Sequence, residues 1–273
     1  MLFLGYLASV FMGVTLGLLG GGGSILTVPI LVYLFKVPPA TATVYSLFVV
    51  GATTLLGSYS YMRSRTVDFK TVALFGIPSL TGVFLMRTYI VPSIPTVLFS
   101  FGPMQLTKDA LLMVIFAVLM LLASISMIRA KATPQPTKTQ GQDLPATKKK
   151  LPIIGQGIFV GGVTGLVGAG GGFLIIPALI FFRGLSMRLA VGTSLVIITI
   201  NSLFGFANNL ATGLTPDWRL LLTLALIATI GIQLGTRMAS KTDEKFLKKA
   251  FGYFVLLMGS FILIQQIIQM KGA

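Results

Sequence analysis

The chain has 273 residues, of which 55% are hydrophobic and only 10% are charged, whereas a soluble domain carries about 25% charged residues, so most of its surface must lie in lipid. It contains no Cys, no His and only six acidic residues, which excludes disulfides, thiolate catalysis and Cys or His metal sites and argues against an enzyme. The net charge of +15 is better explained by the Lys and Arg that membrane proteins concentrate on the cytoplasmic side than by nucleic-acid binding.

The first apolar segment, residues 1–36, is too long for one membrane span of roughly 20 residues. It is interrupted by Gly20, Gly21, Gly22 and Gly23, and consecutive glycines break a helix because they hold backbone entropy and offer no side-chain packing. We therefore predict two helical pieces joined by a glycine turn. The second piece is short, which favours a re-entrant hairpin, although a hairpin of two full spans fits as well.

Six further apolar runs have the length of single spans, and one more segment is broken by glycine. The single spans are predicted at 43–62, 69–90, 109–130, 189–210, 218–238 and 247–269. Residues 91–107 contain three prolines and are expected to form a loop, and the basic, proline-containing stretch 131–150 is expected to be a disordered cytoplasmic linker. Residues 152–183 contain a second glycine cluster and are predicted to form a second broken hairpin. That cluster is Gly168, Ala169, Gly170, Gly171 and Gly172.

An internal repeat appears when the sequence is shifted by 148 residues. Around the glycine clusters, Gly13, Gly17, Leu18, Gly20, Gly22, Gly23 and Pro29 fall on Gly161, Gly165, Leu166, Gly168, Gly170, Gly171 and Pro177. In the helix that follows, Ala42, Ser46, Leu47 and Gly57 fall on Ala190, Ser194, Leu195 and Gly205. We therefore expect three parts: a first transmembrane repeat (1–130), a cytoplasmic basic linker (131–150) and a second transmembrane repeat (151–273).

The basic residues predict how the chain is oriented in the membrane. Clusters at 63–70, 129–150 and 237–249 share one side only if the second broken segment crosses the membrane an even number of times. Both termini are then outside and these clusters are cytoplasmic. The loop at 63–70 is inside and its counterpart at 211–219 is outside, so the two repeats are inverted. The basic residues left outside are Lys36, Arg87, Lys108, Arg219 and Lys271.

The predicted fold is an all-α polytopic membrane protein with two inverted repeats. Each repeat comprises a glycine-broken helical hairpin, re-entrant or fully spanning, and three transmembrane helices. Inverted repeats with discontinuous helices are the layout of many secondary transporters, whose substrate site lies near the bilayer midplane between the repeats.

The two glycine turns are the candidate anion site. Such turns expose backbone N–H groups, and a helix that begins after a turn directs the positive end of its dipole at it. Helices beginning near Ser24 and Phe173 would meet in this way, with Ser24 as a possible N-cap. In the alternative interpretation, the glycines only permit close helix packing or hinge motion. Arg87 and Arg237 lie near helix ends and are expected to snorkel to the interface, and a buried guanidinium in contact with substrate is the alternative.

The helices after the hairpins add hydroxyl and amide groups to this candidate site. Ser46 and Ser194 are equivalent under the repeat, as are Thr53 and Asn201, although such side chains also bond within their own helix. The full set of candidate substrate-binding residues is Gly20, Gly21, Gly22, Gly23, Ser24, Tyr45, Ser46, Thr53, Gly168, Ala169, Gly170, Gly171, Gly172, Thr193, Ser194 and Asn201.

The paired glycine clusters, each after a Gly-x-x-x-Gly-Leu segment, and the following Gly192-Thr193-Ser194-Leu195 resemble the TauE/SafE family of membrane permeases. The resemblance covers nearly the whole chain outside 131–150. It implies about eight membrane segments and export of sulfite or organosulfonates, with the glycine clusters, Thr193 and Ser194 in the site. The first half departs from the motif with Val44-Tyr45-Ser46, where Tyr45 would narrow the pocket.

These observations predict a secondary transporter that exports small sulfur-containing anions across the cytoplasmic membrane. Its expected partners are a small anionic substrate and the lipid bilayer, with no nucleic acid, no metal, no cofactor and no enzymatic activity. Any proton coupling is expected to travel on the substrate, because the spans offer no acidic or His relay. A passive channel for small anions or neutral solutes is the alternative, and the oligomeric state is left open.

Overall fold

The structure is a computed structural model that describes residues 2–90, 93–95, 97–101, 104–129, 150–167, 172–211, 213 and 215–271. The predicted linker, apart from Lys150, lies outside the described residues. So do Gly168, Ala169, Gly170 and Gly171 of the second glycine cluster.

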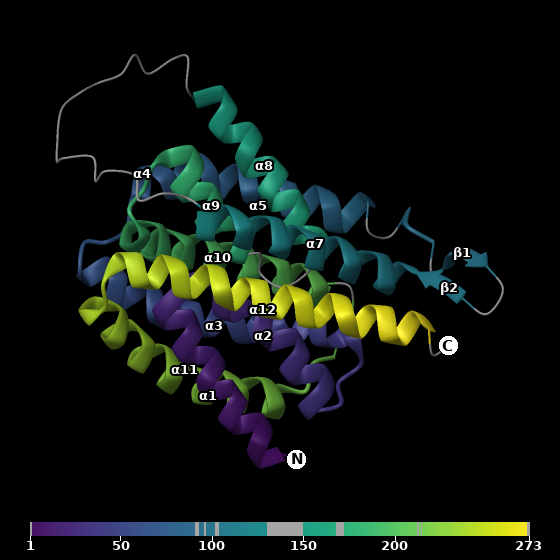
Figure 1. Ribbon diagram of the computed structural model, residues 1–273. Coiled ribbons are helices and arrows are strands. Elements are labelled where there is room, and N and C mark those ends of the chain that lie inside the picture. The colour runs from purple at the N-terminus through teal and green to yellow at the C-terminus, as the bar shows by residue number, and fades with distance from the viewer. Residues whose placement is uncertain are drawn as a thin grey trace.

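The described chain is helical apart from one small sheet, as the predicted fold class requires (Figure 1). The first half comprises α1 (Leu2–Leu19), the tight turn η1 (Gly20–Gly23), α2 (Ser24–Pro29), η2 (Ile30–Leu34), α3 (Pro39–Arg63), α4 (Phe69–Thr71), η3 (Val72–Gly76), α5 (Ile77–Leu85), η4 (Met86–Ile90), β1 (Val97–Phe101), β2 (Met104–Thr107) and α7 (Lys108–Arg129). The second half comprises α8 (Lys150–Val167), α9 (Gly172–Arg183), α10 (Met187–Ala211), α11 (Trp218–Lys241) and α12 (Glu244–Lys271). The elements from α4 to η4 follow one another without a break.

The prediction of a loop over 91–107 is wrong in part. Strands β1 and β2 pair antiparallel there, with Phe99 opposite Leu106 and Phe101 opposite Met104. Aromatic and β-branched residues favour paired strands, and pairing satisfies backbone N–H and C=O groups that would otherwise be left bare at the membrane surface. Prolines limit the strands to a few residues each.

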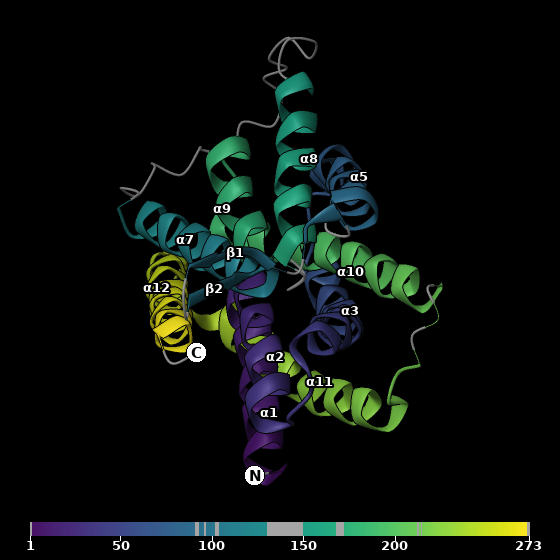
Figure 2. The same cartoon turned by 90° about the vertical axis from the view of Figure 1, so that its right-hand side faces the viewer.

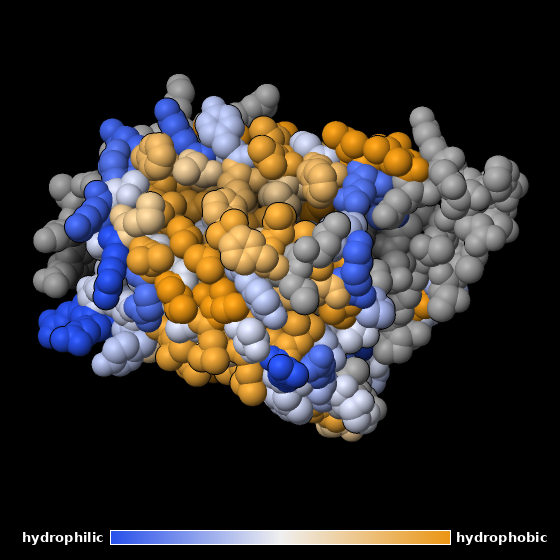
Figure 3. All heavy atoms as spheres, turned by 90° about the horizontal axis from the view of Figure 1, so that it is seen from below, coloured by the Kyte–Doolittle hydropathy of each residue, from blue (hydrophilic) through white to orange (hydrophobic). Residues whose placement is uncertain are grey.

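Five helices are long and apolar enough to cross a membrane, and they coincide with predicted spans. They are Thr41–Arg63, Phe69–Ile90, Met187–Ala211, Trp218–Lys241 and Lys245–Ile268. Their outer faces form an apolar band between two hydrophilic ends (Figure 3), with side chains such as Leu226 and Leu257 each 67% exposed. The chain is therefore a polytopic membrane protein whose band faces lipid.

Both glycine-broken segments fold back on themselves. In the first, the Phe35 ring lies against Gly5 and its centroid is 5.5 Å from that of Tyr6, so the second piece ends where α1 began. In the second, α8 and α9 pack side by side as an antiparallel pair. The two hairpins enter the molecule from opposite sides and their tips meet at its centre (Figure 2).

Helices of the first half pack against helices of the second half. If each helix is replaced by its repeat equivalent, the same set of packed pairs results. α1 packs along α11, and its repeat equivalent α8 packs along α5. Both pairs run parallel: Gly13 then Gly17 of α1 meet Ala228 then Ile232 of α11. Glycines at these crossings let the backbones touch, as small residues do in membrane helix pairs.

The remaining two pairs join equivalent helices, and both pairs are antiparallel. α3 crosses α10 with Gly51 against Leu203 and Leu47 against Gly205. α7 packs against α12, where Ile128 meets Gly252 and Met120 meets Gly259. In these two pairs, each helix therefore runs in the direction opposite to that of its equivalent.

Positions with left-handed backbone follow the same shift of 148 residues. Lys36 (φ 57°) corresponds to Gly184 (φ 64°), and Arg65 (φ 54°) corresponds to Gly213 (φ 89°). The hydrogen bond that closes each hairpin end is repeated as well, from Val37 N to Leu31 O at 3.0 Å and from Leu185 N to Leu179 O at 3.4 Å. The repeat read from the sequence thus extends to local backbone conformation.

Candidate functional site

The centre of the molecule is a backbone contact between the two hairpin tips. A Cβ atom added to Gly21 would overlap the Gly172 backbone, and one added to Gly172 would overlap Gly21. Gly20 adopts the left-handed conformation (φ 64°), and a Cβ there would lie 3.1 Å from the Ser194 Oγ of α10. Glycine is therefore required at this contact for both space and conformation.

The rest of the first turn is tightly enclosed. Gly22 belongs to the same turn, and Gly23 packs against the Thr15 hydroxyl and the Leu16 backbone. The expectation that Ser24 caps α2 is wrong: Gly23 occupies the N-cap position, without a side-chain hydrogen bond. The Ser24 hydroxyl instead donates to the Gly21 carbonyl at 2.7 Å, because a helical residue after the cap reaches back to the turn before it.

Ser194 lies on α10 beside the hairpin tips, and further buried polar side chains follow it along the same helix. Ser194, Ile198 and Asn201 follow one another at helical spacing, and Ile198 abuts Gly172. Ser194 and its equivalent Ser46 are fully buried, and each donates to a carbonyl of its own helix, Val191 O at 2.8 Å and Thr43 O at 2.7 Å. Asn201 lies about one turn beyond the tip contact on the same stripe.

Three polar atoms beside the α3–α10 crossing have no hydrogen-bond partner among the described residues. They are Thr53 Oγ1, Asn201 Oδ1 and Ser202 Oγ, in side chains that are at most 3% exposed. The crossing itself is pinned by a hydrogen bond of 2.9 Å from Thr199 to Thr54. A buried polar atom without a partner costs about 1–3 kcal/mol, so each of these three atoms has hydrogen-bonding capacity left for water or a bound polar group.

Sequence reasoning selected Thr53 and Asn201 as candidates but did not select Ser202 or Ser79. Ser79 lies on α5 and accepts a hydrogen bond of 2.9 Å from Asn201 Nδ2. The repeat carried a signal for Ser202, which is equivalent to Thr54. Nothing in the sequence placed α5 beside α10.

Tyr45 and Thr193 are not brought to the hairpin tips. The Tyr45 hydroxyl accepts a hydrogen bond from Asp217 N at 2.8 Å, and the Thr193 hydroxyl accepts one from Asp68 N at 3.0 Å. Each aspartate in turn caps the helix that follows it. The two hydroxyls are thus equivalent anchors for the loops before α11 and α4, and Gly192 lets the Thr66 carbonyl pack on α10.

Arg87 does not snorkel as expected. Its Nε donates to the Gly165 carbonyl in the last turn of α8 at 3.2 Å. A guanidinium is attracted to a helix C-terminus because unpaired carbonyls and the dipole make that end negative. The attraction of the Arg87 side chain to the C-terminus of α8 is therefore stronger than its attraction to the membrane interface. Arg237, in contrast, is exposed, as expected.

The loops with most of the described basic residues lie together at one end of the molecule. Arg183 at the end of α9 pairs with Asp68 at 3.8 Å and donates to Thr71 at 3.1 Å. Arg188 donates to the carbonyls of Ser240 and Thr242 at 3.2 and 3.0 Å. Within the described part of the chain, no group of three His, Cys, Asp or Glu could hold a metal ion.

Comparison with known proteins identifies the family. The sequence model described as "Sulfite exporter TauE/SafE" matches residues 5–262. The chain belongs to the TauE/SafE family. TauE/SafE relatives with the name "Probable membrane transporter protein" include one from Xylella fastidiosa (strain 9a5c), 29% identical over 92% of this chain and 90% of its own length.

Two further relatives have the same kind of name. YunE of Bacillus subtilis (strain 168) is 30% identical over 89% of this chain and 90% of its own length. A protein of Methanocaldococcus jannaschii is 25% identical over 93% and 94%. No solved structure matches the chain. The protein is therefore a TauE/SafE membrane transporter.

Proposed function

We propose that this transporter exports small sulfur-containing anions, sulfite or organosulfonates, across the cytoplasmic membrane. The observation that carries the proposal is the contact of the two hairpin tips beside buried polar atoms that lack partners among the described residues. The proposed site comprises the first glycine turn (20–23), Gly172 and Ser194 at the tips, and Thr53, Asn201 and Ser202 at the crossing.

Neutral donors suit a small oxyanion at this depth in the membrane. Backbone N–H groups at the first turn and the start of α9 carry partial positive charge, and the Thr53 and Ser202 hydroxyls can each donate a hydrogen bond. By the repeat, Gly168, Ala169, Gly170 and Gly171 are proposed to complete the site. Ser24 and Ser46, whose hydroxyls donate to backbone carbonyls, and Tyr45 and Thr193, whose hydroxyls accept from aspartate N–H groups, are assigned to its support. The Ser194 hydroxyl also donates to a carbonyl, and Ser194 is assigned to the site for its position beside Gly20.

The proton, if one is coupled to transport, is proposed to travel on the substrate. The three unpartnered atoms comprise the Thr53 and Ser202 hydroxyls, which can donate, and one acceptor, the Asn201 carbonyl oxygen. Hydrogen sulfite carries acceptor oxygens and one proton to donate, so it can satisfy both kinds of group, whereas a fully ionised sulfonate cannot donate. Sulfite flux is therefore expected to fall as rising pH removes that proton.

The proposed mechanism is alternating access by two inverted repeats. Support comes from the antiparallel packing of the equivalent helices α3 with α10 and α7 with α12. Further support comes from the parallel pairs α1–α11 and α8–α5, which correspond to each other under the repeat. Because the tips touch through backbone atoms, substrate can reach the site only when they separate. One repeat would rock against the other to open the site to alternate sides.

We further propose that both termini face outside and that the basic end is cytoplasmic. The clustering of the 63–70, 183–188 and 237–249 loops at one end supports this orientation under the positive-inside rule. The 131–150 linker would then be cytoplasmic, between the repeats 1–130 and 151–273.

Sulfite flux into proteoliposomes tests the function and the site separately. Ser202→Ala removes an unpartnered hydroxyl, and we expect it to weaken apparent sulfite affinity by about tenfold. Gly172→Ala is expected to abolish flux, since the tips can no longer touch. Ser124→Ala is the matched control, because Ser124 is equally buried but bonds within its own helix on α7.

The outcomes are distinguishable. Absence of flux for every sulfur oxyanion in the unmodified protein would overturn the function. Normal flux and affinity in Ser202→Ala and Gly172→Ala would overturn the site alone. Counterflow separates the mechanisms, because external substrate accelerates a carrier, whereas a passive channel shows no such acceleration.

A further inference from the structure

Asn201 on α10 has an amide group that is hydrogen-bonded at one end only. The side chain is 3% exposed, and its nitrogen donates to the Ser79 hydroxyl on α5 at 2.9 Å. The Oδ1 atom at the other end is buried and has no hydrogen-bond partner among the described residues. This oxygen can therefore accept a hydrogen bond from whatever group fills the space beside it.

The Ser79 hydroxyl determines which end of the Asn201 amide is left over. A serine hydroxyl has one proton, and Ser79 donates it to the Gly76 carbonyl at 2.9 Å, so towards Asn201 it acts as an acceptor. If the amide were rotated, Oδ1 would face Ser79 Oγ, and the hydrogen bond to Gly76 would have to break to satisfy it. The network therefore keeps the Asn201 nitrogen on α5 and leaves the carbonyl oxygen for a ligand.

This arrangement is not repeated at the equivalent positions. With the shift of 148 residues, Asn201 corresponds to Thr53, and Ser79 corresponds to Ile227. An isoleucine side chain forms no hydrogen bond, and the Thr53 hydroxyl, which has no partner among the described residues, can turn to donate or to accept. Position 53 thus offers an adaptable group, whereas position 201 offers a fixed acceptor.

The helices around this part of α10 place their charges elsewhere. α3, α5 and α9 pack against α10. The charged residues of these four helices, with η4 counted as part of α5, all lie within three residues of a helix end: Arg63, Arg87, Arg183 and Arg188. The tyrosines of α3 and η4 stay neutral below about pH 10. An effect of neutral pH on binding at Asn201 therefore comes from the ligand.

We propose that Ser79 is a positioning residue that makes Asn201 select substrates with a hydrogen-bond donor, so that hydrogen sulfite binds in preference to fully ionised sulfonates. This selection rests on the proposed function, because it names which sulfur oxyanion the same site favours. Hydrogen sulfite donates its proton to Asn201 Oδ1, and its oxygens accept from hydroxyl and backbone N–H groups. A sulfonate without a hydroxyl places an oxygen against Asn201 Oδ1, and two acceptors then face each other without a proton.

Ser79→Ala tests the positioning role. It removes the hydroxyl that accepts from Asn201 but keeps the Ser79 backbone, which packs on Gly161 of α8. The released amide can turn its nitrogen toward the ligand, so a sulfonate is no longer at a disadvantage. The preference for hydrogen sulfite over methanesulfonate should fall by about tenfold, the usual effect of one hydrogen bond. Asn201→Leu removes the amide and should lose the preference as well.

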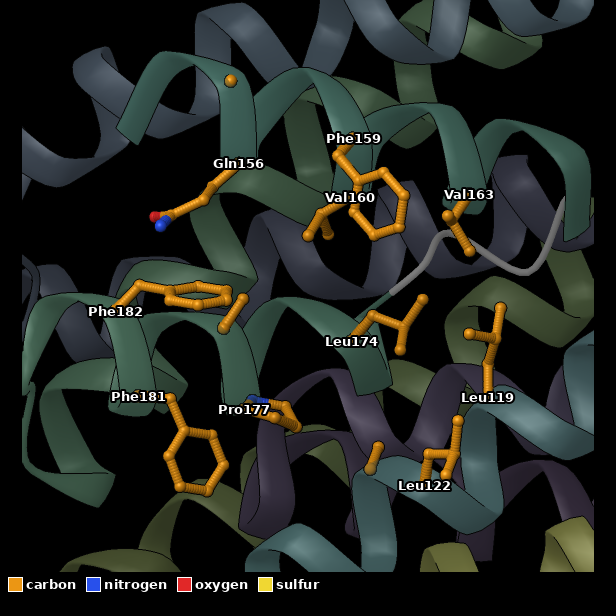
Figure 4. A pocket seen from close by; sticks show the side chains of 13 residues that line it. Leu119, Leu122, Gln156, Phe159, Val160, Val163, Leu174, Pro177, Phe181 and Phe182 are labelled. Carbon is orange, nitrogen blue, oxygen red and sulfur yellow. The ribbon is translucent and has the colours of Figure 1, made fainter. Parts of the chain in front are cut away.

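Gln156→Leu is the matched control. Gln156 also has a buried amide oxygen without a partner among the described residues. It lies with Phe182 at one end of an apolar groove of about 580 Å³ between α7 and the α8–α9 hairpin (Figure 4), and Asn201 does not line this groove. The variant removes an amide of the same kind away from Ser79 and should keep the preference of the unmodified protein.

Competition for sulfite uptake into proteoliposomes measures the preference. At a pH where hydrogen sulfite predominates, the inhibition constant of methanesulfonate is divided by the apparent affinity constant for sulfite, so that differences in protein amount cancel. Methanesulfonate should compete about tenfold more weakly than hydrogen sulfite binds in the unmodified protein and in Gln156→Leu. In Ser79→Ala and Asn201→Leu the two constants should be nearly equal.

The pH profile is a second measurement, which a purely structural role of Ser79 would not change. In the unmodified protein, the apparent affinity for total sulfite should fall with the fraction of hydrogen sulfite as pH rises. In Ser79→Ala the fall should be shallower, because the released amide can also donate to the dianion. If Ser79→Ala does not fold, Asn201→Leu and the profile of the unmodified protein still decide.

The outcomes separate this selection from the function itself. An unchanged preference in both Ser79→Ala and Asn201→Leu, or a sulfite affinity of the unmodified protein that does not vary with pH, would overturn the selection and leave sulfite transport in place. Loss of the preference in Gln156→Leu would contradict the assignment to Asn201. Absence of uptake for every sulfur oxyanion would overturn the proposed function, and the selection with it.

Discussion

Lys36 and Gly184 occupy the same left-handed position at the ends of the two hairpins, yet only one of them is suited to it. A residue with a Cβ is destabilised by roughly 1–2 kcal/mol in this conformation, while glycine loses more backbone entropy on folding. Lys36→Gly should therefore raise the free energy of unfolding by up to about 1 kcal/mol, and Gly184→Ala should lower it by about 1 kcal/mol. Denaturant unfolding in detergent measures both, and a loss of stability in Lys36→Gly would contradict the assignment.

The Tyr45 and Thr193 hydroxyls are predicted to act on stability and not on substrate affinity. Tyr45→Phe removes the acceptor for Asp217 N, and Thr193→Val removes the acceptor for Asp68 N. Each change should cost about 0.5–1.5 kcal/mol, the usual contribution of one hydrogen bond. The thermal shift induced by sulfite compares affinities, and it should match that of the unmodified protein in both variants.

A direct role of Tyr45 or Thr193 in binding would show itself in the same measurement. The sulfite-induced shift would then shrink while the melting temperature without sulfite stayed near its original value.

At the scale of elements, glycines divide into those that join helices and those that do not. Gly231 of α11 touches the α1 backbone at Val10, Val14 and Gly13, whereas Gly155 of α8 touches nothing. Gly231→Ala should lower the free energy of unfolding by about 1–3 kcal/mol through overpacking. Gly155→Ala should raise it by about 0.5–1 kcal/mol, because alanine favours the helix. Thermal unfolding of the two variants side by side checks both signs.

The spans could be predicted from the sequence because each corresponds to one continuous run of apolar residues. The predicted span 189–210 lies within α10, and 109–130 differs from α7 by one residue at each end. Strands β1 and β2 were missed because prolines dominate that stretch and the strands are short. The Ser24 cap was wrong because a chain of four glycines already turns the backbone before the helix starts.

The candidate site could be predicted only in part, because its members come from elements far apart in the sequence. Glycine clusters and repeat-equivalent polar residues singled out Gly20, Gly172, Thr53 and Asn201 as candidates. The hydrogen bonds from Asp217 N to Tyr45 and from Asp68 N to Thr193 depend on the positions of the loops in the folded protein. No spacing along the chain predicts those positions.

For the whole molecule, sidedness is the open prediction, and the absence of Cys makes it easy to test. Ser64 and Thr215 are exposed in loops that the proposed orientation places on opposite sides. In intact cells an impermeant maleimide should label Thr215→Cys and spare Ser64→Cys until the membrane is permeabilised. Ser240→Cys, at the same end as Ser64, serves as the control. Labelling of all three from outside would refute the proposed orientation.

The interleaved packing of α1 with α11 and of α5 with α8 constrains how the protein is made. Gly13 cannot meet Ala228 until the ribosome has added the residues between them, which takes about 10–40 s at 5–20 residues per second. During that time the glycine-lined face of α1 lies in the bilayer without its partner α11. Biogenesis therefore passes through an intermediate in which α1 lacks its partner helix for many seconds. A chain that stops after α10 leaves the α11-binding face of α1 uncovered and accessible to quality-control proteases.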